Sequence, residues 1–176
     1  MKQLMLLRHF KSSSHEPGRT DRDRALAPRG QHDAVAMAET MVAGGLIPDR
    51  ILCSPARRTR ETLTALQPGL GDVRDVIFIE GLYAGSDMDY RDIIAANGGD
   101  SARLLLIGHN PRIHVTALTL VGGGDRGSKG KWTRLAEKYP TGALAVIGFD
   151  AQSWSAIAEG SGQLETFIQP RELGDT

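Results

Sequence analysis

The feature that most constrains the fold of this chain is an apolar run at residues 4–7, Leu-Met-Leu-Leu, which ends abruptly in Arg8 and His9. Four consecutive apolar residues are typical of a strand buried on both faces, as in the parallel sheets of α/β proteins. Ligands of such sheets bind in the crevice beyond the carboxyl ends of the strands. The run therefore predicts a buried strand that carries Arg8 and His9 to a functional edge.

Two later segments have the same design. An apolar strand at residues 50–53 leads into Ser-Pro-Ala-Arg-Arg at 54–58, and another at residues 103–107 leads into Gly-His-Asn-Pro at 108–111. Parallel strands end at the same edge of a sheet, so three strand ends are expected to bring two histidines and at least two arginines together.

Between these strands the sequence alternates helix-like and strand-like segments. A helix is predicted from Pro28 to the stop at Gly44, with Val35, Ala38, Met41 and Val42 facing the sheet. A second is predicted with Ser54 as N-cap and Pro55 at the first helical position, ending before Pro68-Gly69. Further helices are predicted near residues 87–96, 110–121 and 135–139, and further strands at 76–79, 143–149 and 164–168. This order predicts a three-layer α/β fold with a mainly parallel sheet and an antiparallel final strand, in a single domain over residues 1–176.

Composition excludes several classes of partner. The 21 basic residues balance the 21 acidic ones, so no global field attracts nucleic acid or an anionic membrane. Cys53 is the only cysteine, which excludes an internal disulfide and a cysteine-based metal cluster. No apolar run approaches the ~20 residues that a membrane span needs. We expect a cytoplasmic protein with no nucleic-acid or membrane partner.

The residues at the predicted edge suit a phosphoryl group. A lone histidine or arginine at a strand end is most often structural, but two of each are unlikely to converge by chance. Guanidinium groups such as those of Arg8 and Arg58 bind phosphate oxygens in a planar, bidentate manner. One histidine can then act as a nucleophile and the other as a charged donor.

The motifs at residues 7–13, 54–62 and 107–111, in this order, resemble the histidine phosphatase superfamily, whose founding relatives are the phosphoglycerate mutases. Their spacing and the chain length are most similar to the short SixA-type phosphohistidine phosphatases. The resemblance implies a phosphoglycerate mutase-like fold without a large lid insertion, and no cofactor or metal. It also implies that His9 is the nucleophile, that Arg8 and Arg58 bind the phosphate, and that His109 is held charged to stabilise the transferring group.

Other positions in the motifs are less regular. Phe10 replaces a small residue and is expected to crowd the pocket floor, while His15 replaces an asparagine of the mutase-like members. Glu80 follows the third strand, where many members carry a general acid, but simple exposure is an equal alternative. Ser12 and Asn110 are expected to contact the phosphate, and for Ser12 a plain turn role remains open.

The expected function is removal of a phosphoryl group from phosphohistidine on a protein, such as a phosphotransfer domain in signal transduction. A phosphoramidate leaves as an imidazole and needs a general acid less than an alkoxide does. Two alternatives remain: a phosphatase for small phosphate monoesters, and a non-catalytic module that binds phosphate or a phosphoprotein.

Overall fold

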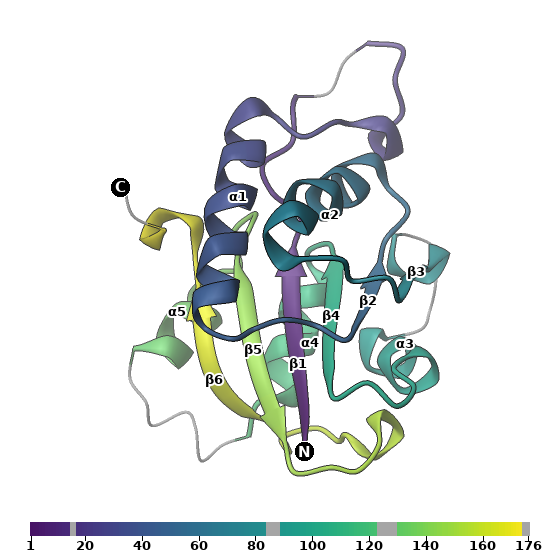
Figure 1. The fold of residues 1–176 in the computed structure, drawn as a ribbon, viewed down its shortest axis with the longest axis vertical. Coiled ribbons are helices and arrows are strands. Elements are labelled where there is room, and N and C mark those ends of the chain that lie inside the picture. Colours follow the sequence, from purple (N-terminus) through teal and green to yellow (C-terminus); the bar gives the residue numbers. More distant parts are fainter. Residues whose placement is uncertain (15–16, 84–88, 123–129, 174–176) are drawn as a thin grey trace.

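A six-stranded sheet forms the centre of the fold, with the strand order β3-β2-β4-β1-β5-β6 (Figure 1). The computed structural model describes residues 1–14, 17–83, 89–122 and 130–173. The strands are β1 (Lys2–Arg8), β2 (Arg50–Cys53), β3 (Val76–Phe78), β4 (Arg103–Gly108), β5 (Leu144–Phe149) and β6 (Gln163–Ile168).

β1 is a central strand, as its apolar run predicts. It pairs in parallel with β4 on one side and antiparallel with β5 on the other, and residues 4–7 are fully buried. β2 lies parallel to both β3 and β4, whereas β6 is antiparallel to β5. The antiparallel final strand is confirmed, and β5 is antiparallel to β1 as well, so the sheet is mixed.

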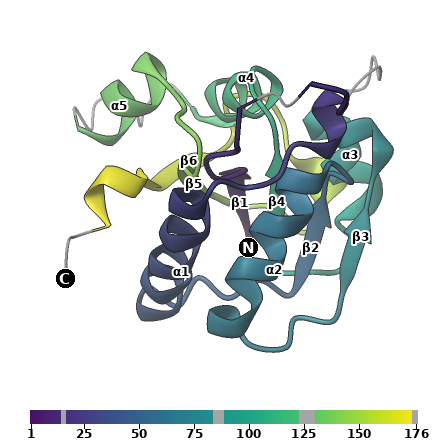
Figure 2. The same ribbon diagram turned by 90° about the horizontal axis from the view of Figure 1, so that it is seen from above.

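Helices cover both faces of the sheet, which confirms the three-layer α/β architecture (Figure 2). α1 (Pro28–Ala43) and α2 (Arg57–Leu70) cover one face. α3 (Tyr90–Asn97), α4 (Arg112–Leu120) and α5 (Lys131–Glu137) lie on the other. Short 3-10 turns η1 (Asp21–Asp23), η2 (Glu80–Leu82), η4 (Trp154–Ala156) and η5 (Pro170–Glu172) complete the described elements. None of the described helices is both long and apolar enough to cross a bilayer.

The predicted buried face of α1 is partly wrong. Val35 and Val42 are 52% and 46% exposed. The buried positions are Ala34, Met37, Ala38 and Met41. Their spacing of three and four residues forms one stripe, and Val35 and Val42 lie about 100° around the helix from Ala34 and Met41. The helix is therefore rotated relative to the prediction, so that its alanine and methionine stripe faces α2 and the sheet.

The predicted limits of α2 are also wrong. The helix begins at Arg57, with Ala56 as N-cap, and continues through Pro68 to Leu70. Gly71 ends it with a φ of 82°, a left-handed conformation that favours glycine. Gly69 has a packing role instead, because a Cβ there would lie 2.7 Å from the Cβ of Ala38 on α1.

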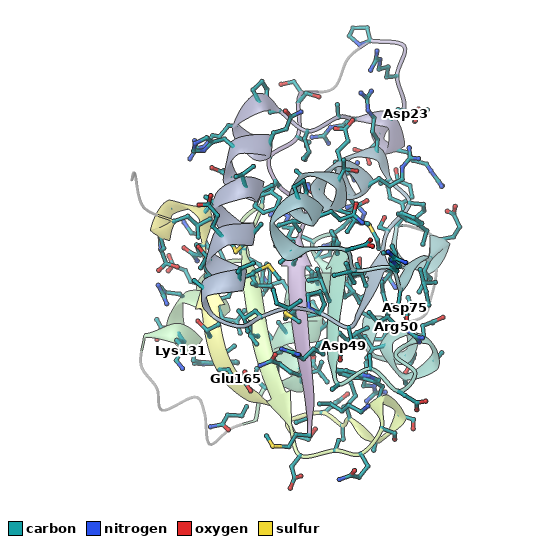
Figure 3. All side chains as sticks on the ribbon, in the orientation of Figure 1. Asp23, Asp49, Arg50, Asp75, Lys131 and Glu165 are labelled. Carbon is teal, nitrogen blue, oxygen red and sulfur yellow. The ribbon has the colours of Figure 1, made fainter. Side chains whose placement is uncertain are left out.

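Polar side-chain contacts link the two outer strands, β3 and β6, to neighbouring elements. Arg50 of β2 donates from Nε to Asp75 beside β3 at 2.7 Å, and the two side chains lie together in Figure 3. Lys131 of α5 donates from Nζ to the backbone carbonyl of Glu165 in β6 at 2.6 Å (Figure 3).

Candidate active site

The carboxyl ends of β1, β2 and β4 lie at one edge of the sheet (Figure 1). A pocket of about 250 Å³ is lined by residues that follow β1 and β4 and by Arg58 in the first turn of α2. It is lined by six of the seven predicted site residues: Arg8, His9, Ser12, Arg58, His109 and Asn110. Lys11, Arg24 and Thr141 complete the lining. The predicted convergence of three strand ends therefore produces one strongly basic pocket.

His9 is buried and has a defined tautomer. Its Nδ1 lies 2.8 Å from the backbone carbonyl oxygen of Phe10, which can only accept, so Nδ1 carries the proton. Nε2 is then unprotonated and accepts from Nε of Arg58 at 3.3 Å. Burial lowers the pKa of His9 most, the Phe10 carbonyl opposes this, and the charges of Arg58 and Arg8 add to the lowering, so that the pKa lies at about 3. The neutral imidazole with an unprotonated Nε2 is the form that can attack phosphorus.

Arg58, in the first turn of α2, is buried and fully engaged. Its Nη1 donates to the backbone carbonyl of Asp21 at 2.8 Å. Nη2 donates to the Asp21 carboxylate at 3.1 Å and to Nδ1 of His109 at 3.3 Å. The guanidinium thus contacts both histidines and fixes a positive charge between them.

Arg8 has one unsatisfied hydrogen-bond donor among its guanidinium nitrogens. Its Nη1 donates to the backbone carbonyl of Tyr139 at 2.9 Å, whereas its buried Nε has no hydrogen-bond partner among the described residues. Burial and the nearby charge of Arg58 lower the pKa of Arg8. A buried, unsatisfied donor in a basic pocket is suited to an anion.

Burial, together with the neighbouring His9 and Arg58, lowers the pKa of His109 to about 3, so the ring is neutral in this structure. The expectation that His109 is held charged concerns a transferring phosphoryl group and stays a prediction. Because Arg58 can only donate to Nδ1, the proton of His109 is on Nε2, which donates to the buried hydroxyl of Ser54 at 2.7 Å. The rings of His9 and His109 are 5.3 Å apart between centroids. The positive charges of Arg58 and Arg8 disfavour protonation of His109.

Ser12 and Asn110 each present a polar group to the pocket. The Ser12 hydroxyl accepts from Nη2 of Arg24 at 2.7 Å. Asn110 donates from Nδ2 to the carbonyl of Tyr139 at 3.0 Å, and its buried Oδ1 has no partner among the described residues. Tyr139 therefore orients both Arg8 and Asn110 through one carbonyl oxygen.

Glu80 does not line this pocket, and its state is unsuited to a general acid. Its side chain is 71% exposed, and both carboxylate oxygens accept from the guanidinium of Arg22, at 2.8 and 2.6 Å. The hydrogen bond from Arg22 lowers the pKa of Glu80. An ionised carboxylate paired in this way is not a ready proton donor.

Phe10 does not crowd the pocket floor as expected. Its ring is fully buried and belongs to the core beneath α1 and α2, outside the lining of the pocket. It fits because position 142 is glycine, where a Cβ would lie 2.6 Å from Cδ1 of Phe10. The substitution therefore leaves only its backbone in the site, as the acceptor for His9. His15 lies outside the described residues.

Sequence reasoning missed Asp21, which lies in the charged run 19–24. Its carboxylate accepts from Arg58, from Arg24 at 3.0 Å and from the hydroxyl of Tyr83 at 3.0 Å. Partial burial raises the pKa of Asp21, but the hydrogen bonds from Arg24 and Tyr83 and the charge of Arg58 bring it below its usual value. No local pattern distinguishes Asp21 from its charged neighbours, since its role depends on where η1 meets α2.

Comparisons with known proteins agree with this geometry. A family model described as the histidine phosphatase superfamily (branch 1) matches residues 4–84. The uncharacterized protein ML1117 of Mycobacterium leprae is 32% identical over 174 residues, spanning 94% of this chain and all of that protein.

Solved structures show the same similarity. The structure of a candidate phosphohistidine phosphatase SixA from Nakamurella multipartitia is similar, with 30% identity and a TM-score of 0.80, over 97% of this chain and 96% of that one. A candidate SixA from Agrobacterium tumefaciens gives 26% identity and a TM-score of 0.74, over 96% and 98% of the two chains. These relationships support phosphatase activity. The chain belongs to the histidine phosphatase superfamily, as a SixA-type member with the phosphoglycerate mutase-like fold.

Proposed function

We propose that this protein hydrolyses phosphohistidine on a partner protein through a covalent phosphohistidine intermediate at His9. The observation that carries the proposal is the state of His9, which is neutral, with its proton on Nδ1 and an unprotonated Nε2 that accepts from Arg58 in a pocket lined by two arginines. A module that only binds phosphate has no need of an unprotonated nucleophile. The substrate class fits a phosphotransfer domain of a cytoplasmic signalling relay.

The proposed reaction has two displacements at phosphorus. Nε2 of His9 attacks the phosphorus atom and forms a P–N bond, while the bond to the substrate imidazole breaks and its electron pair returns to that nitrogen, which takes a proton from water. Water then attacks the phosphoryl group on His9, the second P–N bond breaks, and inorganic phosphate and neutral His9 are released. Arg8 and Arg58 hold the oxygens, whose charge they offset in both transition states.

His109 is assigned a donor role that depends on the bound anion. In the empty site its Nδ1 accepts from Arg58, so donation to a phosphoryl oxygen requires a proton at Nδ1. A bound phosphoryl dianion favours that proton, because an opposite charge nearby stabilises the imidazolium. Ser54 holds the opposite nitrogen and keeps the ring in place.

Two features favour a protein-borne phosphoramidate over an alkyl phosphate. The one carboxylate expected as an acid, Glu80, is exposed and paired, and an imidazole leaving group depends less on such an acid than an alkoxide does. Only residues 79–89 lie between β3 and α3, which leaves no room for a large lid over the pocket. A site without a large lid insertion is accessible to a side chain on a protein surface.

The test compares the release of inorganic phosphate from two substrates, a phosphohistidine-bearing phosphotransfer domain and p-nitrophenyl phosphate. Wild type is compared with His9→Ala and with His32→Ala, a matched control at an exposed histidine of α1. We expect fast turnover of the phosphoprotein, weak hydrolysis of the ester, loss of both in His9→Ala and neither lost in His32→Ala. Radiolabelled phosphate trapped on the wild type should be acid-labile.

The other outcomes separate the alternatives. Efficient ester hydrolysis without action on the phosphoprotein would assign a phosphatase for small monoesters. Phosphate binding without turnover or covalent label would assign a non-catalytic module.

A further inference from the structure

A second cavity, of about 260 Å³, adjoins the phosphate pocket and shares Lys11 and Thr141 with it. It lies between the segment after β1, the start of α1, the segment after α5 and η5 at the end of β6. A molecule that places its phosphoryl group beside His9 can extend past Lys11 and Thr141 into this space. The proposed reaction uses none of the residues found only in this cavity.

The lining of the cavity is strongly basic. Four cationic side chains, Lys11, Arg29, Lys138 and Arg171, face a single acidic one, Asp33. Asp33 pairs only loosely with Arg29, at 3.8 Å. In the described ranges of the chain, Lys11, Lys138 and Arg171 have no ion-pair partner. Like charges gathered around one hollow favour an anionic occupant.

Gln169 points to a ligand independently of these charges. Its side chain lines the cavity and is only 1% exposed, and neither its amide nitrogen Nε2 nor its amide oxygen Oε1 has a hydrogen-bond partner among the described residues. The backbone at this position is fixed, because the Gln169 N–H donates to the Glu172 carboxylate at 2.8 Å and the Glu172 N–H returns to the Gln169 carbonyl at 2.8 Å. Buried donors without an acceptor are rare in folded proteins. An oxygen of an anion in the cavity would supply the missing acceptor.

We propose that this cavity binds a second anionic group, a carboxylate or a phosphate, carried by the same substrate whose phosphoryl group is transferred to His9. The inference rests on the proposed function, which places the phosphoryl group in the neighbouring pocket. The anionic group can come from an acidic side chain of a phosphoprotein or from a second charged group of a small phosphate ester. Both sources have the chemistry that the four cations and Gln169 recognise.

The experiment measures kcat and KM for substrates that differ by one charge. One pair is a phosphohistidine peptide with either glutamate or glutamine beside the phosphohistidine. The other is 3-phosphoglycerate and glycerol 3-phosphate, and p-nitrophenyl phosphate serves as a substrate without a second anionic group. The enzymes are wild type, Lys138→Gln, Arg171→Gln and, as a matched loss of charge far from the cavity, Arg74→Gln, whose exposed side chain pairs with Asp72.

We expect wild type to prefer the charged member of at least one pair by about tenfold in kcat/KM, mainly through KM, because one charge-assisted contact has about that effect. Lys138→Gln and Arg171→Gln should reduce the preference and leave p-nitrophenyl phosphate unchanged, and Arg74→Gln should retain it. A preference in the peptide pair assigns a phosphoprotein, and a preference in the ester pair assigns a small molecule. Equal kcat/KM within both pairs, or a loss that also affects p-nitrophenyl phosphate, would overturn the proposal.

The experiment distinguishes a wrong proposed function from a wrong assignment of the second cavity. If wild type hydrolyses none of these substrates, the proposed function fails, and calorimetric titration of 3-phosphoglycerate against glycerol 3-phosphate still tests the cavity. Tighter binding of 3-phosphoglycerate that is lost in Arg171→Gln supports the second site, and equal affinities contradict it.

Discussion

The Asp21 carboxylate occupies donors that a phosphate would use, so its removal should tighten phosphate binding. Nη2 of Arg58 donates to Asp21 at 3.1 Å while also contacting His109, whose ring lies next to that of His9. A phosphate that binds Arg58 either displaces the Asp21 carboxylate from Nη2 or shares Nη2 with it. In both cases the phosphate and the carboxylate, two negative groups, lie close together. Asp21→Asn keeps an acceptor oxygen of the same size and removes the charge.

The magnitude follows from the separation and exposure of the two anions. Two acceptors of one nitrogen lie about 5 Å apart, where unit charges repel by about 3 kcal/mol at an effective dielectric constant of 20 and by about 0.8 kcal/mol in water. The Asp21 side chain is 52% exposed, so solvent screening brings the effect close to the value for water, about 1 kcal/mol. A free-energy change of this size corresponds to about a fivefold lower Ki for inorganic phosphate.

The assay is competitive inhibition of p-nitrophenyl phosphate hydrolysis by inorganic phosphate, with Asp23→Asn as a matched control in the same turn. Asp23→Asn should leave Ki unchanged. An unchanged or higher Ki in Asp21→Asn would refute the competition argument and show that the carboxylate mainly positions Arg58. A fall in kcat for the ester of more than 100-fold, with the phosphohistidine protein unaffected, would instead show that Asp21 supplies a proton.

Three other measurements test the site and the packing beneath it. The pKa values of His9 and His109 are about 3 in the folded protein and about 6.5 in the unfolded chain, so both rings should remain neutral in NMR titrations to pH 4. The free energy of unfolding should fall as the pH drops from 6.5 towards 3, because the unfolded chain then binds more protons than the folded protein. Titration of either ring near pH 6.5 would contradict the burial argument. Ser54→Ala should lower kcat about tenfold and change the ¹⁵N shifts of the His109 ring, since Nε2 loses its acceptor, and unaltered shifts would remove Ser54 from this role. Gly69→Ala should destabilise the fold by about 1–3 kcal/mol in chemical denaturation, because the added Cβ would meet α1, and a more stable variant would contradict the close approach.

The sequence is most informative where one physical effect dominates. The apolar runs at residues 4–7 and 104–107 are buried on both faces, so their composition alone identifies central strands. Histidine and arginine residues at the ends of those strands converge because parallel strands end at one edge, and six of the seven predicted site residues line one pocket. Whether those residues carry the proposed roles is left to the experiments above.

Features that depend on tertiary packing could not be predicted in this way. The rotation of α1 follows from its contact with α2, and the continuation of α2 through Pro68 leaves Gly69 at that contact. Ser54 is a residue type that favours the N-cap position, but its hydroxyl forms a hydrogen bond with His109, which follows a different strand. Glu80 occupies the expected place in the chain, yet Arg22 from a distant loop pairs with it.

The antiparallel direction of β5 has a consequence for how such a site can diverge. Because β5 runs opposite to β1, with Leu144 beside Leu7, the chain entering β5 meets the same edge that the chain leaving β1 reaches. Residues 139–141 thus supply a carbonyl to Arg8 and a wall shared by both cavities. Insertions before β5 can therefore alter which substrates are accepted, while His9 directly after β1 and His109 directly after β4 remain where the sheet holds them.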